Sequence, residues 1–463
     1  MKWLEVMDLD RDVLPELKKN PLVQKGLFDG ARKLALYPEN RETLNMCHMF
    51  IEKTTEVLEE LIIHANFDTP DSRDPRDPTS NGSTIDNREL NDSATAPGLL
   101  TTTMFSHMLP FEKCTPFKKL TSLRLHRINL RHCADTWCTF VDFTQMQHLR
   151  LYQCTGVDSL MDQLSKSRNL PKQLKIFELQ HRDNADNEAL IALDGFLCLV
   201  SGLRDLIVDL ECVKALPAAA GVARHGKTLE LLNVHCSNDS NPPDPDTEEL
   251  IWDTEEFEKI CKACTKLEQL SCAWPSTSLI RSPSDEWKAY ESAASSLREM
   301  VTLHISSWPS NKPSTQPLPR QVYEVLLQSL AQRTFEQAAS TKSSVPDQPS
   351  GSSAANAAPS GDATTSTETS AEAPPLKPSK LRLLAFGISD KIYEREDSKD
   401  QVIYIRSTSK DAEGKDKIHA APIGWCVRQY IEPRSDVLDF VLHRASRPPC
   451  QEESRFGIRD EDE

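Results

Sequence analysis

No run of about 20 consecutive apolar residues occurs in the sequence, which excludes a transmembrane helix of ordinary length. The N-terminal segment MKWLEVMDLDRDVL carries charges throughout and lacks the apolar core of a secretory signal. The thirteen cysteines are an odd number and lack the spacing of a disulfide framework. We therefore expect a cytoplasmic or nuclear protein with reduced thiols and no membrane partner.

The chain also contains fewer positively charged than negatively charged residues. The chain has 54 Lys and Arg residues against 70 Asp and Glu residues, giving a formal net charge of -16. A protein that binds nucleic acid through its phosphates needs a basic face. We therefore expect no nucleic-acid partner.

Familiar catalytic motifs are missing. GxSxG, HExxH and GxGxxG do not occur in a suitable context, and the twelve histidines do not cluster in the sequence. The segment Gly221–Thr228 matches the phosphate-loop pattern GxxxxGKT, but a helical segment precedes it and a strand follows it, the reverse of the required order. Cys261 and Cys264 have no second ligand pair nearby, so we expect both thiols in the core of a helical repeat. The sequence thus predicts no enzyme, no cofactor or metal, and no nucleotide at Gly221–Thr228.

The sequence does contain a phrase of one apolar residue, two variable, one apolar, one variable and one apolar, which recurs along most of the chain. Most copies lie 26 to 30 residues apart once polar insertions are removed, which leaves room for a strand and a returning helix. Helical stripes such as Val157, Leu160, Met161 and Leu164 lie between the phrases. The central positions of the phrases are Leu4, Leu34, Leu61, Leu123, Leu149, Phe177, Leu206, Leu232, Leu270, Met300 with its register open, and Leu384. The period predicts an α/β fold with a parallel concave sheet and convex helices.

Polar stretches divide the predicted array. We expect a repeat array over 1–306 with a disordered insertion at 68–98, and a loop and helix of an oversized terminal repeat over 307–340. A Ser-, Thr-, Ala- and Pro-rich disordered linker at 341–380 follows. The last repeat strand and a capping segment occupy 381–450, and an acidic tail occupies 451–463.

The residue pattern of the repeats resembles that of leucine-rich-repeat proteins. The resemblance is carried by LRLHRINL at 123–130, LRLYQCTGVDSL at 149–160, LIVDLECV at 206–213 and LLNVHC at 231–236. It implies a horseshoe-shaped solenoid in which Cys154 turns inward after its strand and caps backbone groups. LDGFLCLVSGLRDLIVDLE and ARHGKTLELLNVHC are also similar to fungal F-box and leucine-rich-repeat proteins, although the F-box is not visible here.

The residues between and after the apolar strand positions form the candidate binding site. Because side chains alternate along a strand, these residues face the concave surface, and stacked repeats align them in columns. Tyr, His and Arg on a rigid sheet are typical of protein interfaces, while polar residues also belong on any solvated strand. The candidate residues are Tyr37, His64, Arg124, His126, Arg150, Tyr152, Glu178, Gln180, Asp209, Asn233 and His235.

These features predict a non-catalytic module that binds a protein partner. The F-box-like resemblance implies the substrate-recognition part of an SCF-type ubiquitin ligase adaptor. A general leucine-rich-repeat scaffold without a ligase role is the alternative. A GTPase-activating protein of the leucine-rich-repeat type also ends in an acidic tail, as RDEDE does here, but its repeat wording is absent.

Overall fold

The computed structural model of the chain describes residues 2–6, 16, 19–38, 41–65, 103–108, 116–184, 186–238, 250–310, 319–339, 379–387, 401–410, 412–414 and 416–423. The predicted insertion at 68–98, nearly all of the predicted linker at 341–380, and the segments 424–450 and 451–463 lie outside these residues. Ser379 and Lys380, at the end of that linker, are described. The Lys380 backbone N–H donates to the Arg298 carbonyl at 3.1 Å.

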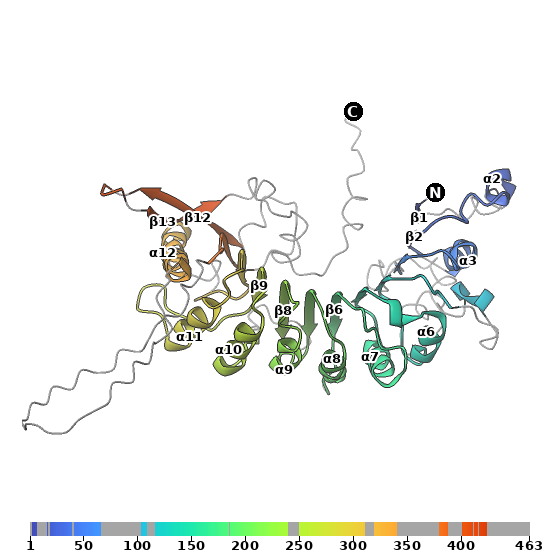
Figure 1. Ribbon diagram of the computed structural model, residues 1–463, viewed down its shortest axis with the longest axis horizontal. Helices are drawn as coiled ribbons and strands as arrows, with labels where there is room; N and C mark the ends of the chain where they lie inside the picture. Colours follow the sequence, from blue (N-terminus) through green and yellow to red (C-terminus); the bar gives the residue numbers. More distant parts are fainter. Residues whose placement is uncertain are drawn as a thin grey trace, which may run out of the picture.

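One 13-stranded sheet organises the described chain, and its strands follow one another in sequence order (Figure 1). Strands β1 to β11 are parallel. Their bounds are β1 Trp3–Val6, β2 Lys33–Leu36, β3 Glu60–His64, β4 Ser122–His126, β5 His148–Tyr152, β6 Ile176–Arg182, β7 Asp205–Glu211, β8 Leu231–Ser237, β9 Gln269–Cys272, β10 Thr302–Ile305 and β11 Leu383–Phe386. The predicted α/β class and parallel sheet are therefore confirmed.

The apolar phrase sets the register of the sheet. Each central residue lies opposite its counterpart on the neighbouring strand, as Leu123 does with Leu61 and with Leu149. The predicted strand centres Leu34, Leu61, Leu123, Leu149, Phe177, Leu206, Leu232 and Leu270 are all fully buried. A repeat therefore buries its apolar side chains against its neighbours and could not form a core alone.

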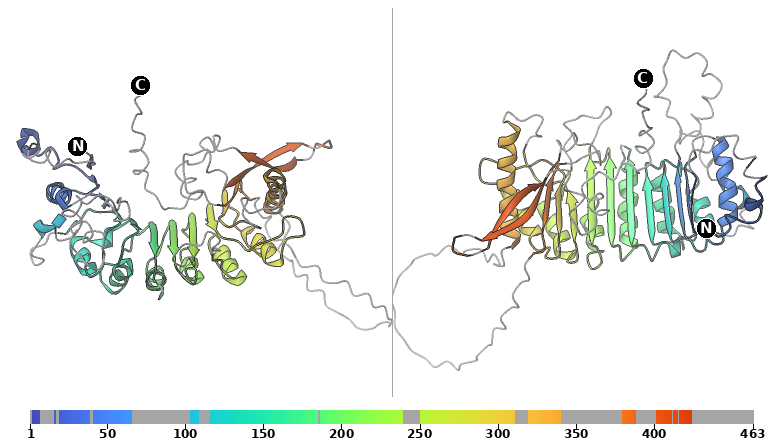
Figure 2. Two further views of the ribbon diagram at one scale, coloured as in Figure 1. Left: turned by 180° about the vertical axis from the view of Figure 1, so that it is seen from behind. Right: turned by 90° about the horizontal axis from the view of Figure 1, so that it is seen from above.

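Helices cover one face of this sheet, and in the left view of Figure 2 the sheet curves with its strands on the inner side. The helices are α2 Pro21–Gln24, α3 Arg41–Thr54, α6 Ala134–Phe140, α7 Val157–Lys166, α8 Glu188–Leu199, α9 Ala219–Ala223, α10 Thr254–Ala263, α11 Asp285–Ala294 and α12 Arg320–Ala339, with 3-10 turns at Ser106–Met108 and Phe143–Gln145. The predicted stripe on α7 is buried. Asp253 caps the start of α10, because its carboxylate accepts a hydrogen bond from the Glu256 N–H at 2.7 Å. No helix in these described ranges is long and apolar enough to cross a membrane.

The register left open at Met300 is resolved by β10. Its central residue is Leu303, which pairs with Leu270 on β9 and Leu384 on β11. Leu297 and Met300 are buried in the turn before the strand. Met300 is the first apolar position of the phrase centred on Leu303, and Leu297 is an additional apolar residue three positions before it. The interpretation of Cys154 is confirmed: it is buried, and its thiol donates to the carbonyls of Leu125 and Tyr152.

The C-terminal end of the sheet changes direction. β12 (Val402–Lys410) pairs antiparallel with β11, and β13 (Asp416–Ile423) pairs antiparallel with β12. Helix α12 lies against the outer edge of β13, where the Gln332 amide accepts from the Ala420 N–H at 2.7 Å and donates to the Ile418 carbonyl. Gln328 donates to the Ala420 carbonyl at 2.7 Å. Two amide side chains thus occupy backbone groups that an exposed edge strand would offer to another chain.

Candidate functional site

The candidate residues lie on the face of the sheet that points away from the helices, which we call the inner face. They form two rows that cross the strands. In one row Arg124, Arg150 and Glu178 are directly opposite one another on β4, β5 and β6. In the other row His64, His126, Tyr152, Gln180, Asp209 and His235 follow one another from β3 to β8. Residues far apart in the sequence are therefore immediate neighbours in space.

Most of these side chains are buried, which the sequence did not predict. Only Tyr37, Arg124 and Arg150 are half-buried. The buried ones are His64, His126, Tyr152, Glu178, Gln180, Asp209, Asn233 and His235. Strands about 4.8 Å apart bring side chains of one row into contact, and inward curvature brings them closer. The buried part of the row therefore acts as a platform that positions the half-buried side chains.

An ion pair holds the middle of the inner face. The Arg150 Nε donates to the Glu178 carboxylate at 2.6 Å, and the Tyr152 hydroxyl donates to the other oxygen of that carboxylate. Burial lowers the pKa of Arg150 and the Glu178 charge raises it, with a net upward shift. Burial, and then the Glu178 charge, raise the pKa of Tyr152. Both groups therefore keep their ordinary protonation state, and Glu178 is fully engaged within the chain.

A chain of hydrogen bonds crosses β8 to β11. The Ser271 Oγ lies 3.1 Å from the His235 Nε2 and 2.7 Å from the His304 Nδ1, while the His304 Nε2 lies 2.7 Å from the Gly387 carbonyl oxygen. With neutral rings, the carbonyl requires an N–H at the His304 Nε2, so the His304 Nδ1 accepts from Ser271 and His235 donates to Ser271. On the neighbouring strands Gln180 donates to Asp209 at 3.2 Å. These groups hold the strands together and are not accessible to a substrate, since Ser271 and His304 are fully buried.

His304 and Arg127 are not among the site residues predicted from the sequence. The sequence leaves the register of the phrase at Leu297 and Met300 open, so it does not assign His304 to a strand position. Arg127 lies just beyond β4 in the left-handed region of the backbone, at φ 57°, where strand alternation no longer applies. Placing Leu303 in the column of Leu270 would have found His304.

Over β3 and β4 the inner face carries a row of aromatic and imidazole rings in place of hydrogen-bonded pairs. The rings of His64 and His126 are 4.0 Å apart at their centroids, with Tyr37 beside His64 and Tyr152 beside His126. Burial, and then the charge of Arg127, lower the pKa of His64 to about 4. Burial, and then His64 and Arg127, lower the pKa of His126 to about 3. Both imidazoles are therefore neutral at physiological pH.

The phosphate-loop-like segment has the predicted order, with α9 before it and β8 after it. A Cβ on Gly226 would lie 2.3 Å from the Ala263 carbonyl oxygen, so this glycine allows the segment to pack against the end of α10. The Thr228 hydroxyl donates to the Leu203 carbonyl at 2.7 Å. The motif residues thus take part in packing between repeats.

The cysteines of the described chain are free thiols, and most are buried. Cys261 and Cys264 both lie in the core, as predicted, and burial raises the pKa of Cys264 to about 12. Within the described ranges, no group of three or more His, Cys, Asp or Glu residues could hold a metal ion. These thiols therefore behave as small apolar side chains.

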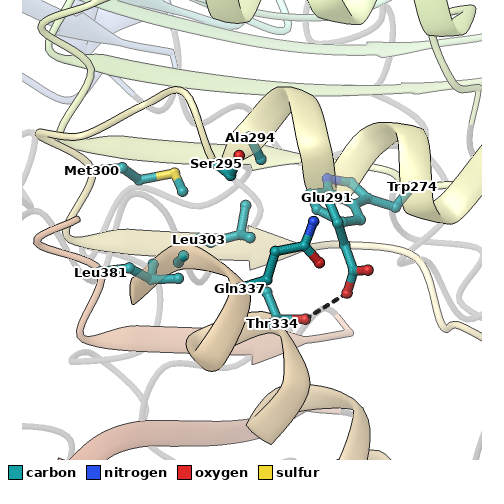
Figure 3. A pocket seen from close by; sticks show the side chains of 10 residues that line it. Trp274, Glu291, Ala294, Ser295, Met300, Leu303, Thr334, Gln337 and Leu381 are labelled. Carbon is teal, nitrogen blue, oxygen red and sulfur yellow. Dashed lines mark hydrogen bonds between the residues drawn. The ribbon is translucent and has the colours of Figure 1, made fainter. Parts of the chain in front are cut away.

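A small pocket lies where α11 and α12 meet the sheet (Figure 3). Glu291 from α11 accepts hydrogen bonds from Thr334 at 3.0 Å and from Arg333 at 2.7 Å, so its carboxylate is already paired. Its cavity volume of about 10 Å³, room for about one water molecule, is far below the ~300–1,000 Å³ of ordinary small-molecule sites. We therefore treat it as a packing gap and not as a ligand site.

The inner face is thus the part of the described chain in which polar, aromatic and charged side chains gather in register. No protein-family model and no curated protein matches the sequence.

Proposed function

We propose that this chain is a leucine-rich-repeat solenoid that binds another protein through the inner face of its sheet and does not catalyse a reaction. The observation that carries the proposal is the register of aromatic, cationic and polar side chains across β2 to β8. A rigid platform with half-buried Tyr and Arg side chains is suited to anchor a partner at low entropic cost. The repeat wording and Cys154 support the leucine-rich-repeat assignment.

The narrower role, reception of substrates for an SCF-type ubiquitin ligase, rests on the sequence resemblance alone. The inner face supports protein binding equally well with or without a ligase.

Site-specific photocross-linking in cells tests the proposal. A photoreactive phenylalanine at Tyr37 reports on the inner face. The same group at Ile191, whose side chain on α8 is 65% exposed, reports on the helix-covered side. We expect a protein partner to cross-link at Tyr37 and not at Ile191.

The partner found in this way is then measured against variants by calorimetry. Tyr37→Ala should weaken binding by about 1 to 3 kcal/mol, while Ile191→Ala should leave the affinity unchanged. Cross-linking at Ile191 alone, together with unchanged affinity of Tyr37→Ala, would move the binding surface to the helices.

A further inference from the structure

Three polar side chains on β3 and β4 have buried nitrogen atoms without a hydrogen bond inside the described chain. His64 and His126 are 3% and 4% exposed, and their ring nitrogens form no hydrogen bond of normal geometry, although the Gln153 side chain lies near His126. The Nε of Arg124 is also buried and unpartnered. Buried polar atoms are normally hydrogen-bonded, but Gln180 Oε1 on β6 and Gln269 Oε1 on β9 also lack a partner, so the informative group is the guanidinium of Arg124, whose half-buried side chain a ligand can reach.

Two guanidinium groups give this place its charge. Arg124 and Arg127 are half-buried, and neither forms an ion pair within the described residues. Arg150 shows the contrast, because its guanidinium is neutralised by Glu178 on the next strand. Arg124 lies over the Tyr152 ring, 6.0 Å from its centroid, and the charge of Arg127 reaches both histidines. An uncompensated positive site thus exists in a chain of net charge -16.

We propose that the inner face over β2 to β5 binds a carboxylate-rich segment of the protein partner. This inference rests on the function proposed above and names the chemistry of that partner. The site consists of Tyr37, His64, Arg124, His126, Arg127 and Tyr152. Guanidinium groups bind carboxylates through paired N–H donors, and half-burial strengthens such bonds. The tyrosines add aromatic anchors beside the charge.

Other ligand classes fit less well. The two guanidinium groups repel a metal cation. Nucleic acid requires a long basic face, whereas this cluster is confined to a few strands of an acidic chain. A single free anion would contact the guanidinium groups but would not reach across to Tyr37 at the end of β2, while a peptide spans all the strands concerned.

Fluorescence anisotropy with the full chain tests the inference. The probe is a labelled peptide of alternating Glu and Ser, and the same peptide with Gln in place of Glu is its neutral match. We expect saturable binding of the acidic peptide at low ionic strength and none of the neutral one. Arg124→Gln combined with Arg127→Gln should weaken binding by about tenfold or more.

A matched control removes the same charge elsewhere. Arg168→Gln combined with Lys172→Gln changes two exposed cations between α7 and β6, and it should leave peptide affinity within about twofold. Equal binding of both peptides, or equal weakening by both double variants, would overturn the inference. Tighter binding of inorganic phosphate than of the acidic peptide would overturn the carboxylate assignment.

The outcomes also separate this inference from the proposed function. A partner that cross-links at Tyr37 but keeps its affinity for the Arg124→Gln and Arg127→Gln variant would refute the acidic-segment inference and leave the proposed function standing. A partner that binds only the helix side, with the acidic peptide still bound at the arginines, would refute the proposed function itself.

Discussion

The inner face over β3 and β4 and the inner face over β5 to β10 occupy equivalent positions of the same sheet, yet their charged groups are paired differently. Over β5 to β10, Glu178, Gln180 and Ser271 each find a partner on a neighbouring strand. Over β3 and β4, His64 and His126 have buried nitrogens without hydrogen bonds. Repeats with one backbone geometry can therefore serve different ends: the second region, over β5 to β10, uses its polar groups to link neighbouring strands, whereas Arg124 and Arg127 of the first region form no ion pair within the described chain.

The largest expected effect comes from breaking the paired region at Glu178. Glu178→Ala leaves the Arg150 guanidinium and the Tyr152 hydroxyl buried without their acceptor, so we expect a loss of about 3 to 5 kcal/mol in the free energy of unfolding. Urea denaturation measures it. Glu211→Ala on β7, whose partly exposed carboxylate pairs with Arg182 at 3.5 Å, is the control and should lose less than about 1 kcal/mol. Equal losses in the two variants would mean that burial of the pair is not what matters.

The histidines over β3 and β4 should make the stability of the protein depend on pH. An unfolded histidine titrates near about 6.5, whereas folding lowers the pKa of His64 to about 4 and that of His126 to about 3. Above about pH 6.5 both states are neutral and pH has no effect. Below it the unfolded chain takes up protons that the folded chain refuses, so stability falls as pH drops towards about 4. Between about pH 7 and about pH 5 the two histidines together should lower the free energy of unfolding by about 4 kcal/mol.

The double variant His64→Phe with His126→Phe isolates this effect from that of the carboxylates. It should keep the stability of the parent within about 1 kcal/mol at pH 7, because it removes polar groups that make no hydrogen bond. Its stability should then decline less steeply with acid than that of the parent protein. Identical pH profiles by thermal denaturation would show that these histidines are not held neutral by the fold.

A smaller loss is expected from the hydrogen-bonded chain of the second region. Ser271→Ala removes the hydroxyl that lies between His235 and His304, and the free energy of unfolding should fall by about 2 kcal/mol. Ser292→Ala, an exposed serine on α11, should change it by less than about 0.5 kcal/mol. If Ser271→Ala changes the free energy of unfolding no more than Ser292→Ala does, the chain of hydrogen bonds makes no net contribution to stability.

Only part of the difference between the two regions could be predicted from the sequence. The apolar phrase located the strands and the parallel register, because one repeat length brings Leu123, Leu149 and Phe177 side by side. The same columns place Arg150 opposite Glu178, 28 residues away, so their ion pair could have been predicted. The burial of the face could not, since it depends on curvature and on side-chain volumes in neighbouring repeats. Nor could the antiparallel turn to β12, which lies beyond the period of the repeat.

The smallest expected effect on stability belongs to the two unpaired guanidinium groups, and it distinguishes a binding role from a structural one. Arg124→Gln with Arg127→Gln removes no ion pair within the described residues, so the free energy of unfolding should change by less than about 0.5 kcal/mol although acidic-peptide binding is lost. Arg150→Gln, on the next strand, deprives the buried Glu178 of its cation and should cost about 3 kcal/mol. Guanidinium chloride screens charge, so urea denaturation is the appropriate measurement. If the double variant loses as much as Arg150→Gln, Arg124 and Arg127 stabilise the fold, and the two regions of the inner face do not differ in the way proposed.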